Sequence, residues 1–222
     1  MTDLPRRFAA ETLGSAILLA TVVGSGIMAE RLTDIPALAL LANALATAAA
    51  LVVLISVLRP ISGAHFNPVV TLAAALQRDL QPTVAAAYVV AQIAGALVGT
   101  ALAHLMFDLP VAQLSQHVRT GGGQWLSEVV ATAGLLLVIS LSGKRQPTSV
   151  PALVGLYIGA AYWFTSSTSF ANPAVTLARA FTDTFSGIAP VDVPAFVVAQ
   201  LAGAALGVGL ARWLQPVPEA TA

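Results

Sequence analysis

The chain has no cysteine and few charged residues. Without cysteine it has no disulfide, no thiolate metal site and no thiol nucleophile. Only 9% of its 222 residues are charged, against about 25% in an ordinary soluble domain, whereas 57% are hydrophobic. The formal net charge is zero, so nothing indicates a nucleic-acid partner or an acidic surface partner. These shortages indicate that lipid, not water, is the main solvent of this chain.

Apolar stretches of about 20 residues recur, and each is long enough to cross roughly 30 Å of hydrocarbon as a helix. Six stretches are predicted to span a membrane: 8–29, 37–58, 83–107, 124–143, 150–167 and 192–214. The first is too long for the apolar region of a secretory signal, so we expect it to remain in the mature protein. No linker divides the chain, which predicts one domain over residues 1–222 with a short disordered tail at 215–222.

Basic residues are distributed unevenly between the predicted loops. With a cytoplasmic N-terminus, six spans place seven of them inside: Arg6, Arg7, Arg59, Arg78, Lys144, Arg145 and Arg212. Three then lie outside: Arg31, Arg119 and Arg179. Because cytoplasmic loops carry the excess of lysine and arginine, the sequence predicts that both termini are cytoplasmic.

The chain contains an internal repeat. Residues 88–103, YVVAQIAGALVGTALA, agree with residues 196–211, FVVAQLAGAALGVGLA, at ten of sixteen positions. Two Asn-Pro segments, SGAHFNPVVTL and FANPAVTL, align at an offset of 105. We therefore predict two copies, about 8–107 and 124–214. Since each copy has three spans, an odd number, the second must be inverted relative to the first.

Each Asn-Pro pair is predicted to begin a short helix, because Asn is a preferred N-cap and Pro is favoured at the first helical position. The apolar runs 68–77 and 173–182 are about ten residues long, or about 15 Å, which is half a bilayer. Half-helices entering from opposite faces would meet at the midplane. Irregular backbone at that depth must be surrounded by protein or by a water-filled cavity, and a pore is the simplest such cavity.

The predicted meeting point suits neutral solutes. The pore midplane is predicted to contain Asn67, Pro68, Val69, Asn172, Pro173 and Ala174. Each helix N-terminus carries roughly half a positive charge, so cations would be repelled there. Each Asn oxygen can cap its own helix while the amide NH2 donates to a passing oxygen. Hydroxylated solutes are therefore expected, and neither a metal site nor a cofactor is predicted.

Several polar residues within the spans are expected to support the half-helices. Glu11 and Glu128 occupy corresponding positions in the first and fourth spans and are predicted to accept hydrogen bonds from backbone N–H groups freed before each half-helix. Gln92 and Gln200 are also equivalent and are predicted to brace the half-helices. His65 either lines the cytoplasmic half of the pore or has a packing role.

With these paired motifs, the chain resembles the aquaporin, or major intrinsic protein, family over essentially its whole length. The resemblance implies an all-α membrane protein of six transmembrane helices and two re-entrant half-helices. It also implies a homotetramer with a pore in each subunit, which passively conducts water, glycerol or related neutral solutes without a cofactor. The chain is similar to the branch encoded beside bacterial arsenic-resistance genes, which implies neutral arsenite or related metalloids as solutes and a bacterial inner membrane.

The sequence departs from the family pattern at the outer constriction. Counting back from the two Asn residues without gaps, and one step beyond Asn-Pro-Ala, places the family's positions on Thr47, Ala160, Ser169 and Val175. Most members have Arg where Val175 stands. We therefore expect a wide, weakly polar constriction, which favours polyols and arsenite over the alternative of a water-selective aquaporin.

Arg179 is a candidate substitute for the missing charge. It lies four residues after Val175, on nearly the same face of the half-helix, which would put a charge at the outer vestibule. The alternative is that its side chain extends to the membrane surface or pairs with Asp183.

Three other classes of protein are alternatives to a channel, and one of them, a purely structural junction protein such as some family members become, is compatible with the sequence. An ion-coupled secondary transporter also uses inverted repeats and broken helices, but it needs an ion-coordinating group where this chain is predicted to present two positive helix ends. An enzyme is not expected, because the sequence has no Ser-His-Asp arrangement, His-Glu-x-x-His run or acidic metal cluster.

Overall fold

A computed structural model describes residues 4–215, except for the side chain of Lys144, so most of the predicted disordered tail, from residue 216 on, lies outside the described residues. Within this range the chain forms helices and no strand. The α-helices are α1 (Leu4–Leu32), α2 (Pro36–Ser62), α3 (Pro68–Leu76), α4 (Pro82–Met106), α5 (Gly122–Arg145), α6 (Val150–Phe164), α7 (Pro173–Arg179) and α8 (Val193–Leu214). Two 3₁₀ turns, η1 (Pro147–Ser149) and η2 (Pro190–Asp192), precede α6 and α8.

Five of the described helices, α1, α2, α4, α5 and α8, are long and apolar enough to cross a membrane. Helix α6 occupies the remaining predicted span but has 15 residues, because the backbone becomes extended at Thr165. The half-helices α3 and α7 begin at the predicted prolines and end at Leu76 and Arg179, before the predicted ends at 77 and 182.

The outside of the bundle is apolar, and its interior contains buried polar side chains among apolar ones. Large apolar side chains are exposed along the long helices, among them Leu45, Val57, Val98, Leu156 and Val198. The completely buried polar side chains of the interior include Glu11, Gln92, Glu128 and Gln200. This distribution suits a protein that is solvated by lipid, since buried polar groups in a bilayer must find partners inside the protein.

Glycines let two pairs of long helices approach closely. A Cβ on Gly95 or Gly99 of α4 would lie 2.2 Å from the carbonyl oxygen of Thr12 or 2.1 Å from that of Ala16, both on α1. Gly203 and Gly207 of α8 meet α5 in the same way. Such pairs of small residues four apart are typical of helices that pack closely in membranes, where close backbone contact replaces the hydrophobic driving force.

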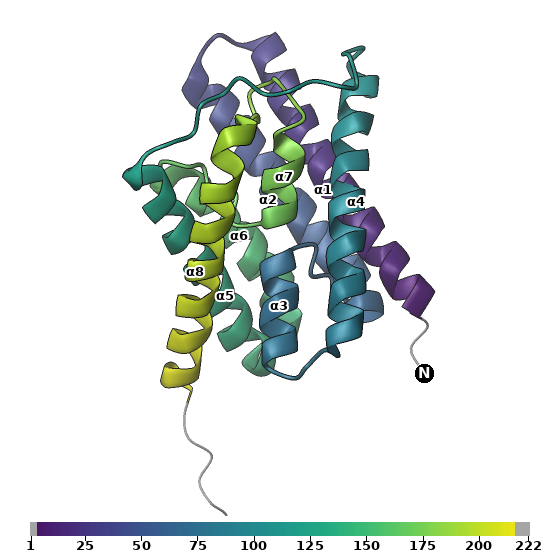
Figure 1. Ribbon diagram of the computed structural model, residues 1–222, viewed down its shortest axis with the longest axis vertical. Coiled ribbons are helices and arrows are strands. Elements are labelled where there is room, and N and C mark those ends of the chain that lie inside the picture. The colour runs from purple at the N-terminus through teal and green to yellow at the C-terminus, as the bar shows by residue number, and fades with distance from the viewer. Residues whose placement is uncertain (1–3, 216–222) are drawn as a thin grey trace, which may run out of the picture.

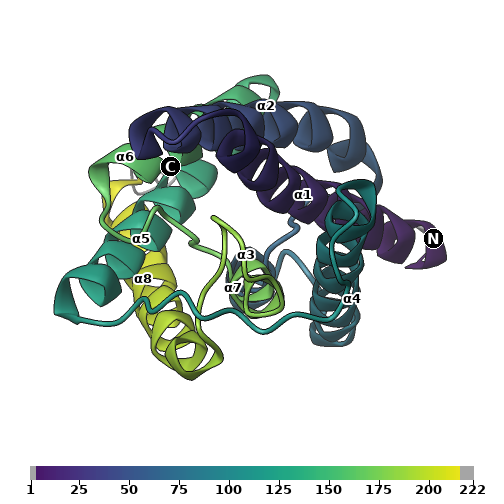
Figure 2. The same cartoon turned by 90° about the horizontal axis from the view of Figure 1, so that it is seen from above.

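The half-helices lie one beyond the other at the centre of the bundle. Figure 1 shows α7 and α3 in line along the long axis, and Figure 2 shows both between α4 and α8, with α1 and α2 on one side. The beginning of α1 and the end of α8 lie at the same end of the bundle (Figure 1). The two segments that sequence analysis marks as too short to span a membrane therefore occupy the space of one further helix.

Candidate functional site

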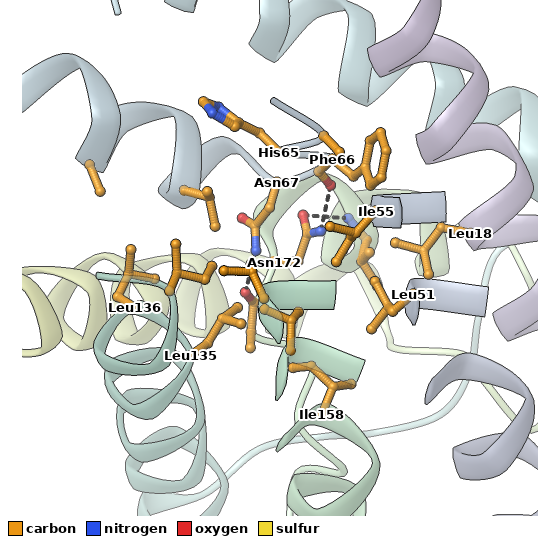
Figure 3. Close-up of a pocket in the computed structure, with 18 of the residues that line it drawn as sticks. Leu18, Leu51, Ile55, His65, Phe66, Asn67, Leu135, Leu136, Ile158 and Asn172 are labelled. Carbon is orange, nitrogen blue, oxygen red and sulfur yellow. Dashed lines mark hydrogen bonds between the residues drawn. The ribbon is translucent and has the colours of Figure 1, made fainter. Parts of the chain in front are cut away.

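A cavity of about 480 Å³ lies within the bundle, and both half-helices contribute to its wall. Much of the wall is apolar, with side chains from α1, α2, α5 and α6 that include Leu18, Leu51, Ile55, Leu135, Leu136 and Ile158 (Figure 3). The few polar groups in the wall therefore stand out as the points where a solute can be recognised.

The two asparagines cap the half-helices as predicted. Asn67 Oδ1 accepts a hydrogen bond from the backbone N–H of Val69 at 3.0 Å. Asn172 Oδ1 accepts hydrogen bonds from Ala174 at 3.0 Å and from Val175 at 3.3 Å. The side-chain oxygens thus satisfy backbone donors that a helix leaves free in its first turn.

The same asparagines also join the two half-helices to each other. Asn67 Nδ2 donates to the carbonyl oxygen of Ala171, and Asn172 Nδ2 donates to that of Phe66, both at 2.8 Å. Figure 3 shows the two amides side by side among the apolar lining. Because an amide NH2 carries two donors, each Asn keeps one N–H beyond this bond.

Not all six residues predicted at the midplane line the cavity. Within the described residues its wall includes Asn67 and Asn172, but not the four residues that follow them: Pro68, Val69, Pro173 and Ala174. These four form the first turns of α3 and α7, and Val69 and Ala174 are each 1% exposed. Because successive helical residues point about 100° apart, the side chains of these four residues point away from the cavity.

Glu11 holds the segment that leads into α3. Its Oε1 accepts hydrogen bonds from Ser62 Oγ at 2.6 Å and from the backbone N–H of His65 at 2.9 Å. Its Oε2 accepts hydrogen bonds from the backbone N–H of Phe66 and from Gln92 Nε2, both at 2.8 Å. Four donors therefore surround one fully buried carboxylate.

Glu128 holds the segment that leads into α7 in the same way. Its Oε1 accepts from Ser167 Oγ at 2.6 Å and from the backbone N–H of Phe170 at 2.9 Å. Its Oε2 accepts from the backbone N–H of Ala171 at 2.8 Å and from Gln200 Nε2 at 2.6 Å. The structure thus places both glutamates against the half-helix entrances that the sequence predicts.

These carboxylates fix an unusual backbone conformation. Five residues of the two entry segments are not glycine yet have positive φ: Ala64 (52°), Phe66 (49°), Thr168 (62°), Ser169 (51°) and Ala171 (48°). Each such residue costs roughly 1–2 kcal/mol. The eight hydrogen bonds to the two glutamates offset this cost, since a hydrogen bond to a charged group contributes about 1.5–3 kcal/mol.

Gln92 and Gln200 connect the carboxylates to the half-helices. Gln92 Nε2 donates to Thr71 Oγ1 of α3 at 2.9 Å, and Gln200 Nε2 donates to Thr176 Oγ1 of α7 at 2.8 Å. Both glutamines are fully buried and do not line the cavity. His65 combines the two predicted roles: it lines the cavity, and its ring lies 3.1 Å from Thr71 Oγ1 and edge-on to Tyr88.

Three of the four residues predicted at the outer constriction line the cavity together. Thr47, Ser169 and Val175 are 2–6% exposed and contribute to one wall. Ala160 does not, because it is exposed on the outside of α6. The prediction for Ala160 is wrong since counting back from Asn172 crosses the non-helical segment 165–171, where helical phase is lost.

Tyr162 takes the place predicted for Ala160. It lies two residues further along α6, about 200° around the helix, and continues a cavity-facing stripe of Val154 and Ile158. Its hydroxyl lies 3.3 Å from Thr47 Oγ1. The outer end of the cavity therefore carries a phenol group that counting from the motif does not find.

Arg179 also lines the cavity. It is 2% exposed, its Nε donates to the carbonyl oxygen of Ser186, and its guanidinium carbon lies 3.4 Å from the centre of the Phe170 ring. It does not extend to the membrane surface. Asp183 instead accepts a hydrogen bond from the backbone N–H of Gln116.

The chain is similar to known proteins in both sequence and fold. The family model described as "Major intrinsic protein" matches residues 1–171, which is more than half of the chain. The chain belongs to the major intrinsic protein family. It is 61% identical over 212 residues to "Aquaglyceroporin AqpS" of Rhizobium meliloti (strain 1021), covering 96% of this chain and 91% of that protein.

More distant members of the family show the same extent of match. An "Aquaporin Z" of Bradyrhizobium diazoefficiens is 27% identical over 230 residues, with 96% of this chain and 95% of that protein covered. The X-ray structure of the aquaglyceroporin from Plasmodium falciparum superposes with a TM-score of 0.66 at 23% identity, over 95% of both chains. The predicted aquaporin fold is thus confirmed. As a family member, the chain is an integral membrane channel for water and small solutes, and it is not an enzyme.

Two residues near the outer constriction are not found from the family motif: Tyr162, which lines the cavity, and Arg119, which contacts the Phe170 ring. Tyr162 could be found from the spacing of four residues that relates it to Ile158 and Val154 on α6. Arg119 has no such signal, because it lies between α4 and α5 outside any helix. Its Nε donates to the carbonyl oxygen of Gly187 at 2.6 Å, its guanidinium carbon lies 5.1 Å from the centre of the Phe170 ring, and burial lowers the pKa of this side chain.

Proposed function

We propose that this channel passively conducts small neutral hydroxylated solutes: glycerol-like polyols, water, and neutral arsenite with related metalloid compounds. The outer constriction is wide where Val175 stands. The observation that carries the proposal is that Val175 lines the cavity at the position where most of the family has Arg. The valine side chain occupies less volume than arginine and offers no hydrogen-bond donor. A solute larger than water can therefore pass at this level. Thr47 and Ser169 contribute small polar side chains to the same wall.

Passive conduction is favoured over ion-coupled transport by the polar groups at the centre. Among the described residues, Asn67 and Asn172 supply the side-chain polar groups where the half-helices meet, and an amide carries no charge to bind a coupling ion. The surrounding apolar wall disfavours a bare cation, which would lose its hydration there. A water-selective channel is disfavoured by the absence of the family's narrowing Arg at Val175.

We further propose the assembly and orientation. The chain is a single domain over residues 1–222, built from two inverted copies, and four chains form a homotetramer with a pore in each subunit. It lies in a bacterial inner membrane with both termini cytoplasmic. Support for the inverted copies comes from the equivalent hydrogen bonds of Glu11 and Glu128. Support for the termini comes from the beginning of α1 and the end of α8, which lie at one end of the bundle (Figure 1).

One reconstitution experiment tests the function. Vesicles containing the purified protein are exposed to an osmotic gradient of an impermeant solute, which reports water flux, and to gradients of glycerol and urea, and their volume is followed by light scattering. Uptake of arsenite and of a methylated arsenical is measured as arsenic content. We expect glycerol and arsenite to enter faster than into empty vesicles, whatever the proton or sodium gradient. Flux that requires such a gradient would establish a transporter, and water flux alone would establish a water-selective channel.

A further inference from the structure

Equivalent positions of the two half-helices face the cavity, and they differ in one respect. Val70 of α3 corresponds to Val175 of α7, and Ala74 corresponds to Arg179, each at the offset of 105 that relates the asparagines. All four residues line the cavity. The position of Arg179 is therefore cavity-facing by the geometry of the half-helix itself, and an arginine stands where the other half has a methyl group.

The guanidinium of Arg179 is held in place, but one of its nitrogens has no hydrogen-bond partner. Its Nε donates to the carbonyl oxygen of Ser186, and the Phe170 ring lies 3.4 Å below its carbon. Ser186 is itself anchored to α1, since its Oγ donates to the carbonyl oxygen of Val22 at 2.9 Å. The Nη1 group, however, is buried and has no hydrogen-bond partner. A buried donor of a charged group costs free energy until an acceptor reaches it.

A second unpartnered polar atom belongs to the residue next to Phe170. Ser169 Oγ is also buried without a partner, and Ser169 directly precedes Phe170, on whose ring the guanidinium lies. Both residues line the same cavity. A hydroxyl group can donate to one oxygen and accept from one nitrogen, which matches a cavity wall that offers both a free N–H and a free Oγ. An alkali cation matches only one of the two and is repelled by the other.

We propose that Arg179 and Ser169 form the solute-selecting site of the outer cavity, which binds a hydroxyl of a passing neutral polyol or trihydroxide. Arg179 Nη1 donates to the solute oxygen, and the solute hydroxyl donates to Ser169 Oγ. The fixed charge of Arg179 excludes cations one helical turn beyond the level that Val175 leaves open. This site rests on the proposed function, because it acts on solutes that the channel conducts.

The test compares Arg179→Met with Arg78→Met. Both remove an arginine, but Arg78 is exposed and does not line the cavity. In vesicles with equal protein content, Arg179→Met is expected to lower the glycerol-to-water permeability ratio about tenfold, the factor that 1.4 kcal/mol represents and slightly less than one charge-assisted hydrogen bond contributes. It should also raise the leak of protons and potassium ions. Arg78→Met should change neither quantity.

Two further variants keep the test decisive if Arg179→Met does not fold. Arg179→Lys keeps the charge and a donor for the Ser186 carbonyl but loses the planar Nη1 group, so cation exclusion should remain while the glycerol-to-water ratio falls. Ser169→Ala removes an oxygen without a protein partner and should lower the ratio as well. An unchanged ratio in folded Arg179→Met, or in Arg179→Lys and Ser169→Ala together, overturns this site. Absence of glycerol flux in the wild-type protein would instead overturn the proposed function.

Discussion

The side-chain amide of Asn172 donates a hydrogen bond to the carbonyl oxygen of Phe66, 106 residues earlier in the chain, at 2.8 Å. The reciprocal bond runs from Asn67 to the carbonyl of Ala171. One residue type therefore performs two tasks at the centre of the channel and keeps one donor free. Its oxygen caps a half-helix, one N–H holds the opposite entry segment, and the second N–H is left over. Asparagine fits this set of demands because it carries an acceptor and two donors on a short side chain.

Replacing one of these amides tests the exclusion of cations. Asn172→Asp keeps an oxygen for the cap of α7 but replaces the donor to Phe66 with a second oxygen, which is ionised at neutral pH when it faces helix N–H groups. We expect the leak of potassium ions and protons to rise, with glycerol flux reduced because the half-helices are no longer joined. Ion flux is measured with a potassium- or pH-sensitive dye in vesicles.

The matched variant Asn67→Asp should act in the same direction, since Asn67 makes the equivalent bond to Ala171. Wild-type ion leak in both variants, with protein that is folded and inserted, would show that these side chains do not face the conducted solute. A rise in only one variant would show that the two halves contribute unequally to the barrier.

Restoring the family's arginine tests the wide constriction. Val175→Arg adds a guanidinium with five donors to a wall that Val175 shares with Thr47 and Ser169. We expect permeability to a methylated arsenical to fall at least tenfold while water permeability falls much less. Val175→Leu, which adds volume without charge, is the control. Equal losses for all solutes at equal protein content would mean that the change acts on folding, and the wide constriction would be disproved.

The buried carboxylates should contribute strongly to stability. In the wild-type protein each oxygen of Glu128 accepts two hydrogen bonds. Glu128→Gln turns one of these two acceptor oxygens into an NH2 group. At least two buried donors then lose their acceptor, at about 1–3 kcal/mol each. The melting temperature in detergent should fall by several degrees, and Glu11→Gln should behave alike. Asp34→Asn, which alters an exposed carboxylate, should leave it unchanged.

The sequence predicts the half-helices well because their signals are local. Asn-Pro places the cap and the first helical residue next to each other, and an apolar run of fixed length follows, so α3 and α7 begin where expected. Glu11 and Glu128 are found because an ionisable residue within an apolar span requires a buried partner. Each of these inferences depends on neighbouring residues or on one chemical rule.

The outer end of the cavity is predicted less well because non-helical segments lie between and around the helices that line it. Ala160 is misplaced since the turn at Thr165 breaks the count from Asn172. Arg119 reaches the Phe170 ring from a long connection with no periodic pattern. The position of Arg179 depends on Ser186, whose hydroxyl donates a hydrogen bond to the carbonyl oxygen of Val22 on α1. No spacing in the sequence indicates this bond.

Close helix packing gives the last prediction. A Cβ added at Gly207 of α8 would lie 2.3 Å from the carbonyl oxygen of Ala133 and 2.9 Å from its Cα, both backbone atoms that cannot rotate away. Gly207→Ala therefore has to separate α8 from α5, at a cost of about 1–3 kcal/mol. Gly209, one half-turn further on the same helix, has nothing within 4 Å of an added Cβ.

Gly207→Ala should accordingly lower the melting temperature and the yield of folded protein in detergent, whereas Gly209→Ala should leave both unchanged or raise them, because Ala favours helix over Gly. Gly99→Ala provides the same test in the other half, since its Cβ would lie 2.1 Å from the carbonyl oxygen of Ala16. If Gly207→Ala and Gly209→Ala melt at the same temperature, the α5–α8 contact can relax freely. Close backbone contact would then not be what holds this pair of helices together, and apolar side chains along the seam would have to supply the stability.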